Sequence, residues 1–255
     1  HFFGVGIDHY PSPALESLNY AKRDVLRVSK ALGGEGAPGG TAAPLASQTI
    51  LVDRRATRAE ILDGLSETVA AASPGDHLVL FMAGHGLRDG DGAFYFALSH
   101  TDVNNLAETG LSWRRLADEL SRLDIRVTIL LDACHAGATG SGAFASNDGA
   151  VNALIDKTQA NVTVIAAAKG RQFSGESPEV GGGFFSVAVA QTLLDRRAEF
   201  DRNGNGALEA VEFYRGVKSL VTARRGTKQT PWMVRNEVVG EYALYKDGDS
   251  GPGST

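Results

Sequence analysis

The sequence contains one cysteine, Cys134, among 255 residues. A single cysteine excludes an internal disulfide, so the chain is not a cross-linked secreted scaffold and fits a reducing compartment. A lone thiol at the end of an apolar run is either a small buried hydrophobic group or a reactive one. The surroundings of Cys134 must decide between these two roles.

Long apolar runs and long basic runs are also missing. No stretch comes near the roughly 20 apolar residues that cross a bilayer, and the first residues lack the parts of a signal peptide. We expect a cytoplasmic protein with no membrane partner. The net charge is -5 and no basic run accompanies it, which argues against direct contact with nucleic acid.

The composition that is present fits one globular domain. Apolar residues make up 43% of the chain and charged residues 22%, and the length suits a single α/β domain. The chain opens at His1 and closes on a Gly-rich, polar stretch. We expect a domain over residues 1–247, followed at 248–255 by a flexible tail or the start of a linker to a missing domain, which would be one source of an activating partner.

Apolar runs alternate with helical patterns along the chain. Runs that read as buried parallel strands lie at 2–7, 77–82, 127–131 and 162–167. Helical patterns lie at 18–32, 58–72, 113–123 and 184–197. This alternation predicts an α/β fold with helices on both faces of a parallel sheet. Residues 33–44 and 137–149 are predicted loops, and 242–245 a last edge strand.

Two of the predicted strands end in reactive side chains. One leads into Gly84-His85-Gly86 and the other into Asp132-Ala133-Cys134. The carboxyl ends of parallel strands meet at one edge of the sheet, where reactive groups gather. An imidazole beside a thiol favours the thiolate and can later protonate a leaving amine. We predict Cys134 as nucleophile and His85 as general acid and base, with the backbone N–H groups of Gly86 and Cys134 stabilising an oxyanion.

Other interpretations of these segments stay open. Taken alone, a cysteine after a buried strand is more often a small hydrophobic residue. The chain could also be a catalytically silent regulatory or interaction module, since a fold does not guarantee its chemistry. Nucleotide binding is disfavoured, because Gly4-Val5-Gly6 lacks the third glycine of a dinucleotide-binding turn.

With Gly84-His85-Gly86 and Asp132-Ala133-Cys134-His135-Ala136-Gly137, the chain resembles the caspase-like cysteine peptidases, and most of all the bacterial metacaspases. The likeness extends to residues 5–10, 18–24, 166–185 and 229–231. It implies a caspase-like three-layer αβα sandwich around a central, mostly parallel six-stranded sheet. It also implies a cysteine endopeptidase of regulated proteolysis in a bacterial stress or defence pathway.

The resemblance also implies the specificity. Caspases carry glutamine two residues before the cysteine, whereas metacaspases carry an aspartate there, which is Asp132 in this chain. Metacaspases pair it with an aspartate of the first helix, and the matching residue is Asp24. Two carboxylates suit a guanidinium or ammonium group, so we expect a protein substrate cut after Arg, or less readily Lys. The alternative for Asp24 is a solvated helix charge beside Lys22 and Arg23.

Substrate peptides of this family add as a strand to an exposed backbone edge. By position, this edge lies near residues 172–176, so the resemblance implies substrate contacts from Phe173, Ser174 and Glu176. The chain departs from the family at Ala83, where relatives often have a serine that contacts the pocket. One hydrogen bond of the pocket is therefore not expected here.

Residues 201–212 have the spacing of an EF-hand calcium loop. Gly206 permits the sharp turn, and oxygen ligands occupy the expected positions: Asp201, Asn203, Asn205, the carbonyl of Ala207, Glu209 and Glu212. The alternative is a helix–loop–helix turn capped by Asx side chains. We expect no cofactor for catalysis, and calcium in this loop only in a structural role.

Overall fold

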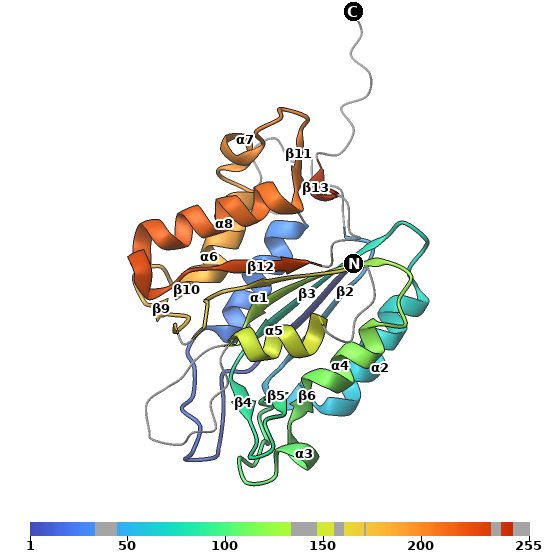
Figure 1. The fold of residues 1–255 in the computed structure, drawn as a ribbon, viewed down its shortest axis with the longest axis vertical. Coiled ribbons are helices and arrows are strands. Elements are labelled where there is room, and N and C mark those ends of the chain that lie inside the picture. The colour runs from blue at the N-terminus through green and yellow to red at the C-terminus, as the bar shows by residue number, and fades with distance from the viewer. Residues whose placement is uncertain (34–44, 134–146, 156–160, 171, 236–240, 247–255) are drawn as a thin grey trace, which may run out of the picture.

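The computed structural model describes residues 1–33, 45–133, 147–155, 161–170, 172–235 and 241–246. Its centre is a six-stranded sheet in the order β12-β8-β7-β3-β1-β2 (Figure 1). Every neighbouring pair is parallel except β12 with β8. The strands are β1 Phe2–Gly6, β2 Gln48–Val52, β3 His77–Ala83, β7 Arg126–Asp132, β8 Val162–Ala166 and β12 Trp232–Arg235. The predicted mostly parallel, six-stranded sheet is confirmed.

The four predicted strands are the central ones, β1, β3, β7 and β8. Apart from the first residues of β3 and β7, their side chains are buried on both faces, which explains the continuous apolar runs. The two edge strands escaped prediction. β2 has only one buried residue and β12 has none, and the apolar run in each strand is only three residues long, at 50–52 and 232–234.

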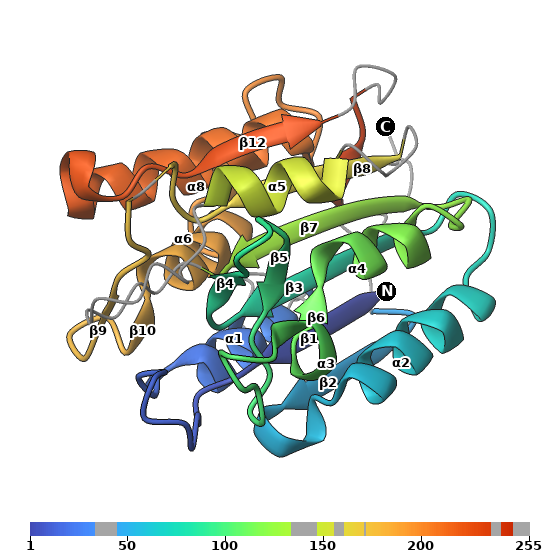
Figure 2. The ribbon, with the colours of Figure 1, turned by 60° about the horizontal axis from the view of Figure 1, so that its bottom comes forward.

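Helices cover both faces of the sheet (Figures 1 and 2). One core cluster joins the sheet to α2 Arg58–Ala70, α4 Trp113–Leu120 and α5 Asn147–Ile155. The other joins it to α1 Ala21–Leu32, α6 Phe184–Leu193 and α8 Ala210–Arg225. The result is the three-layer αβα sandwich expected from the sequence. Among the described helices, none is both long and apolar enough to cross a membrane.

The helices begin and end within a few residues of the predictions. α1 begins at Ala21 instead of residue 18, α4 ends at Leu120 and α6 at Leu193. The predicted loop over 137–149 was wrong at its end, because α5 begins at Asn147. The rest of that loop, most of the loop at 33–44 and the tail at 248–255 lie outside the described residues.

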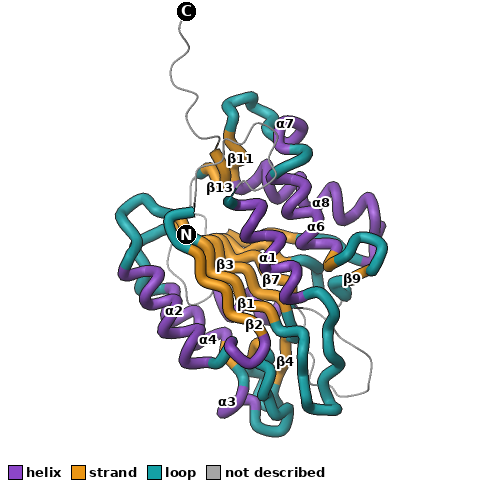
Figure 3. The backbone as a smooth tube through the Cα atoms, turned by 180° about the vertical axis from the view of Figure 1, so that it is seen from behind, coloured by secondary structure: helices purple, strands orange, loops and turns teal. Residues whose placement is uncertain are grey.

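Three small sheets surround the main one. β4 Gly86–Arg88, β5 Phe94–Phe96 and β6 Leu111–Ser112 form the first; β9 Glu176–Ser177 and β10 Gly182–Gly183 form the second. The third pairs β11 Ala207–Glu209 with β13 Ala243–Lys246, as the view from behind shows (Figure 3). The short helices α3 Leu106–Thr109 and α7 Arg197–Phe200 lie in connections. The predicted strand at 242–245 is present as β13, but it is not an edge of the central sheet, because it pairs with β11, and β12 forms that edge.

Candidate active site

The ends of β3 and β7 lie side by side. Ala83, the last residue of β3, pairs with Asp132, the last residue of β7. Beyond the ladder, the N–H of Gly84 donates to the carbonyl of Asp132 at 3.1 Å. The register therefore places the segment with His85 beside the carboxyl end of β7, the strand that precedes Cys134 in the sequence.

Gly84 is required by the space around it. A Cβ at this position would lie 2.8 Å from the ring of Phe96 and 2.9 Å from the hydroxyl of Tyr10. Both distances are shorter than a normal carbon contact, so a larger residue would push His85 out of place. The first glycine of the Gly-His-Gly motif thus allows tight packing next to the imidazole.

His85 is fully buried and held from two sides. Its Nε2 lies 2.7 Å from the carbonyl oxygen of Glu16. Its backbone N–H donates to the Tyr10 hydroxyl at 3.1 Å, and the two rings lie 4.7 Å apart. A carbonyl oxygen only accepts hydrogen bonds, so Nε2 carries the proton and Nδ1 is the basic nitrogen of the neutral ring. This tautomer is the one that a general base acting through Nδ1 requires.

Cys134 lies outside the described residues, so the predicted Cys134–His85 pair and the Cys134 N–H of the oxyanion site stay predictions. Gly86, the other predicted oxyanion donor, is buried at the start of β4. Gly86 is the next residue after His85, so the position of its backbone N–H is tied to the position of His85. The proposed oxyanion contact of Gly86 also stays a prediction.

Asp24 and Asp132 come together across the backbone of Gly183. Both side chains are buried, so the alternative of a solvated charge at Asp24 is wrong. A Cβ on Gly183 would lie 2.7 Å from Oδ2 of Asp24 and 3.2 Å from Oδ2 of Asp132. Only glycine fits between two carboxylates at these distances. The structure therefore brings the two predicted pocket carboxylates together, although 108 positions separate them in the sequence.

Burial raises the pKa of both carboxyl groups to about 7. For Asp24, the nearby Asp132 raises the pKa further, while hydrogen bonds from Ser186 and Gly183 and the charge of Arg27 lower it. For Asp132, a hydrogen bond with Ser174 lowers the pKa and the charge of Glu176 raises it. A bound cation would favour the ionised form of both groups, and this is the electrostatic character of a cation pocket.

The two carboxylates differ in their partners. Asp24 accepts from the guanidinium of Arg27 through Oδ1 and from the N–H of Gly183, at 2.9 Å, through Oδ2. Asp132 has a bond with Ser174, but its Oδ1 is buried and has no partner among the described residues. An unsatisfied buried oxygen of this kind calls for a ligand or an unseen partner.

The predicted substrate segment has one buried and two more accessible side chains. Ser174 is buried and accepts from Nε2 of Gln229 at 3.1 Å. Phe173 is 53% exposed, which is unusual for a large apolar side chain. Glu176 accepts from the side-chain amide of Asn19 at 2.7 Å. Ser174 therefore links Asp132 to Gln229 by hydrogen bonds, while the substrate contact of Phe173 stays a prediction.

Sequence reasoning missed several residues of this site. Arg27 stands one helical turn after Asp24, a spacing that itself indicates a side-chain pair. Tyr10, Gly183, Ser186 and Gln229 reach the site through contacts over long sequence separations. No local pattern marks these four, apart from the resemblance of their segments to the family.

The predicted calcium loop has the turn of an EF-hand. The carboxylate of Asp201 accepts from the N–H groups of Gly204, Asn205 and Gly206, and Glu212 closes the loop by accepting from the N–H of Arg202 at 2.8 Å. The amides of Asn203 and Asn205 both donate to Glu209. Within the described ranges, no three His, Cys, Asp or Glu side chains form a metal cluster, so calcium at Ala207 and its neighbours stays a prediction.

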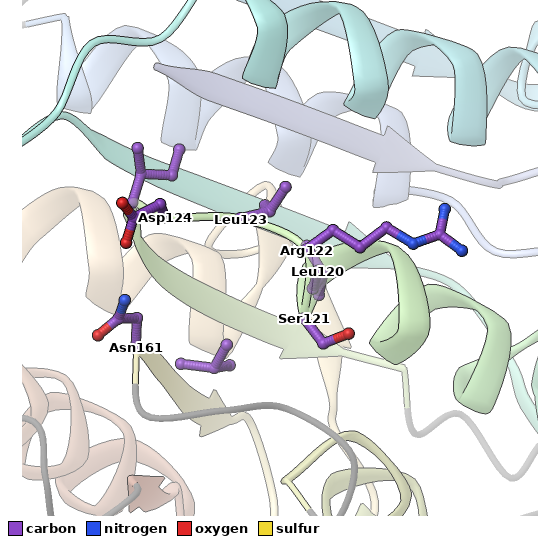
Figure 4. Close-up of a pocket in the computed structure, with 8 residues that line it drawn as sticks. Leu120, Ser121, Arg122, Leu123, Asp124 and Asn161 are labelled. Atoms are coloured by element: carbon purple, nitrogen blue, oxygen red, sulfur yellow. The ribbon is translucent and has the colours of Figure 1, made fainter.

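Two hollows in the described part of the chain are candidates for part of the site. A cavity of about 260 Å³ is lined by residues 120–125 and 161–162, at the amino ends of β7 and β8 (Figure 4). Because reactive groups gather at the carboxyl ends, we do not assign it to the site. An open hollow of about 580 Å³ lies beside Glu176, with Phe184 and Arg225 in its wall.

Comparison with known proteins identifies the class. The family model of the caspase domain, the C14 peptidases, matches residues 5–242. The chain therefore belongs to the caspase-domain family of cysteine peptidases. Among solved structures, it is similar to the protein GSU0716 from Geobacter sulfurreducens, with a TM-score of 0.63, 17% identity and coverage of 97% of this chain and 98% of that chain. At this identity the likeness concerns the fold. A comparison with curated proteins found no match.

Proposed function

We propose that this protein is a metacaspase-type cysteine endopeptidase that cleaves protein substrates after Arg and, less readily, after Lys. Asp132 carries the proposal: its buried Oδ1 has no partner in the described part of the chain and lies at the strand end next to His85. A carboxylate in this position is matched by a positively charged side chain and repels an acidic one.

In the proposed reaction, Nδ1 of His85 takes the thiol proton while the sulfur of Cys134 attacks the carbonyl carbon of the substrate. The backbone N–H groups of Gly86 and Cys134 stabilise the oxyanion. His85 then gives the proton to the leaving nitrogen as the carbon–nitrogen bond breaks, which leaves a thioester. Water attacks the thioester and passes its proton to His85, and the released thiolate is ready for another cycle.

Three structural features support this assignment of roles. The Glu16 carbonyl fixes the tautomer of His85, as the third group does in a catalytic triad. Ala83 and Asp132 pair directly at the ends of β3 and β7. In the sequence, His85 comes two residues after Ala83, and Cys134 comes two residues after Asp132. The buried hydrogen bond from Gln229 to Ser174 fixes the serine that in turn contacts Asp132.

The test compares peptides that differ only in the residue before the cut bond: Arg, Lys, citrulline and Asp. We expect cleavage in the order Arg, Lys, then the other two, with calcium and without it. The matched control is Cys134→Ala, and His85→Ala should lose activity to a similar degree. If no peptide is cleaved under any condition, the chain is the silent module instead. If the Asp peptide is preferred, the cation pocket is wrong while the dyad stands.

The cellular setting that we propose follows the family resemblance: regulated proteolysis in a bacterial stress or defence pathway. Residues 1–247 would act as one peptidase domain. Sequencing the new termini of a cleaved protein partner would report both the substrate and the residue before the cut.

For residues 201–212 we propose a structural calcium ion, bound by the oxygen ligands that the spacing predicts. Antiparallel pairing of β11 with β13 attaches this loop to the last described strand, so a bound ion would stabilise that part of the fold. The test is the thermal unfolding midpoint in calcium, in magnesium and in chelator. A rise with calcium alone that disappears in Glu212→Gln supports the ion, and equal midpoints exclude it.

A further inference from the structure

Arg27 is a cation already present in the acidic pocket. It stands on α1 one turn after Asp24, and its Nη1 contacts Oδ1 of Asp24 and donates to Oγ of Ser186 at 3.0 Å. Its Nη2 donates to the carbonyl of Gly181 at 2.7 Å. The Arg27 side chain is 22% exposed, while that of Asp24 is 4% exposed. The guanidinium is therefore mostly buried and lies between Asp24, Ser186 and the turn at 181–183.

The contacts of Asp24 are complete without a substrate. One carboxylate oxygen receives the guanidinium of Arg27, and the other receives the N–H of Gly183 at 2.9 Å. The turn at 181–183 is thus attached to α1 by both charged side chains. A Cβ on Gly182 would lie 2.5 Å from Oδ1 of Asp24, so the turn packs directly on the ion pair.

The charges in the pocket do not balance without a ligand. Two carboxylates, Asp24 and Asp132, lie near Gly183, and Arg27 pairs with only one of them. A buried carboxylate is stable in its ionised form only with a partner of opposite charge. The remaining carboxylate is Asp132, whose Oδ1 has no partner in the described ranges. One further positive charge would balance the negative charge of Asp132.

We propose that Asp24 and Arg27 are an internal ion pair that positions the 181–183 turn, and that Asp132 alone binds the charged side chain of the substrate. This inference rests on the proposed cleavage after basic residues. Asp24 is then a positioning residue, and Arg27 sets the pocket to accept a single positive charge. The competing arrangement, in which Arg27 withdraws and Asp24 contacts the substrate, makes opposite predictions.

A double-mutant cycle separates the two arrangements. The variants are Asp24→Asn, Arg27→Met and the two combined, each measured with paired peptides that carry Arg or citrulline before the cut bond. Citrulline has the shape of arginine without its charge, so the ratio of the two kcat/KM values reports the charge that the pocket presents. A purely structural defect would lower both values together and leave the ratio unchanged.

Asp24→Asn leaves Arg27 as an unpaired cation beside the pocket. We expect the Arg/citrulline ratio to fall at least tenfold, because Arg27 then repels the substrate charge. Removing Arg27 as well should restore the ratio to within about threefold of the wild-type value. Asp132→Asn should bring the ratio close to one. The matched control is Arg23→Met, since Arg23 also donates to Gly181 from α1 but does not pair with Asp24.

Two results would overturn the inference. If the combined variant has the same low ratio as Asp24→Asn, Asp24 contacts the substrate itself. If Arg27→Met alone raises kcat/KM for the Arg peptide threefold or more, Arg27 competes with the substrate for Asp24. The second result needs only Arg27→Met, so it decides the question even if Asp24→Asn does not fold. Wild-type protein that cleaves no basic peptide would instead refute the proposed function.

Discussion

At the scale of single residues, Asp132 combines deep burial with an oxygen that has no partner among the described residues. Burial raises its pKa to about 7, so near neutral pH a proton competes with a cation for the carboxylate. A guanidinium should therefore bind more weakly as the pH falls through 7. Agmatine, which has a guanidinium and no carboxylate, should lose about tenfold in affinity for each pH unit below 7 and show a plateau above 8.

Competitive inhibition of peptide cleavage by agmatine, measured between pH 5.5 and 8.5, checks this prediction. Asp132→Asn is the control, because it keeps the shape of the side chain and removes the ionisation. It should bind agmatine weakly at every pH. An inhibition constant of the wild-type protein that does not change between pH 6 and 8 would exclude Asp132 as the group that binds the cation.

A substitution at Tyr10 tests how much its hydrogen bond to His85 stabilises the fold. The Tyr10 hydroxyl accepts a hydrogen bond from the buried backbone N–H of His85, at 3.1 Å, and its ring packs on the imidazole. Tyr10→Phe keeps the ring and removes the acceptor, so we expect a loss of about 1–3 kcal/mol in the free energy of unfolding. Urea titration measures this loss. Tyr20→Phe, on a half-buried ring, should change the stability by less than about 0.5 kcal/mol.

At the scale of elements, the buried strands could be predicted because β1, β3, β7 and β8 are apolar on both faces. The edge strands could not, because their apolar runs are only three residues long, at 50–52 and 232–234. His85 could be found locally, from glycines on both sides at a strand end. The approach of Asp24 to Asp132 depends on the sheet order and on the turn at Gly183, and only the family resemblance pointed to it. The guanidinium of Arg27 reaches Gly181 across 154 positions, so packing alone reveals that contact.

The start of α2 gives a prediction at this scale. Thr57 accepts from the N–H of Glu60, and Glu60 accepts from the N–H of Thr57, which together form a capping box. Thr57→Ala leaves an N–H group of the first turn without its side-chain acceptor and should lower the free energy of unfolding by about 1 kcal/mol. Ser66→Ala, at an exposed position of the same helix, is the control and should not destabilise the protein. Equal losses in both variants would mean that the cap contributes nothing beyond helix propensity.

At the scale of the whole molecule, the central sheet and one of its two helical layers together place the charged side chains. β7 supplies Asp132, α1 supplies Asp24 and Arg27, and the turn before α6 contacts both carboxyl groups at Gly183. The two carboxyl groups therefore come together only when the central sheet and the α1–α6 layer are packed together. These two buried groups couple the stability of the fold to pH.

The direction of that coupling follows from the raised pKa values. Asp24 and Asp132 titrate near 7 in the folded state and near 3.8 when unfolded, so between these values the folded protein holds protons that the unfolded chain has lost. Their contribution to stability is complete below pH 3.8 and is lost as the pH rises through 7. His77 acts oppositely, because burial lowers its pKa from 6.5 to about 4, so its contribution is complete above pH 6.5 and is lost as the pH falls through 4.

Both the wild-type protein and Asp132→Asn carry His77, so the contribution of His77 cancels between them and the difference reports the carboxyl group of Asp132. We expect the free energy of unfolding, from urea titrations between pH 5 and 8, to decrease with pH more steeply in the wild-type protein than in Asp132→Asn. The difference in slope should approach about 1.4 kcal/mol per pH unit at pH values well below 7 and vanish above 8. Asp63→Asn, at an exposed position on α2, should keep the wild-type slope. Parallel curves for the wild-type protein and Asp132→Asn would show that Asp132 holds no proton in the folded state above pH 5, which would contradict a raised pKa for this group.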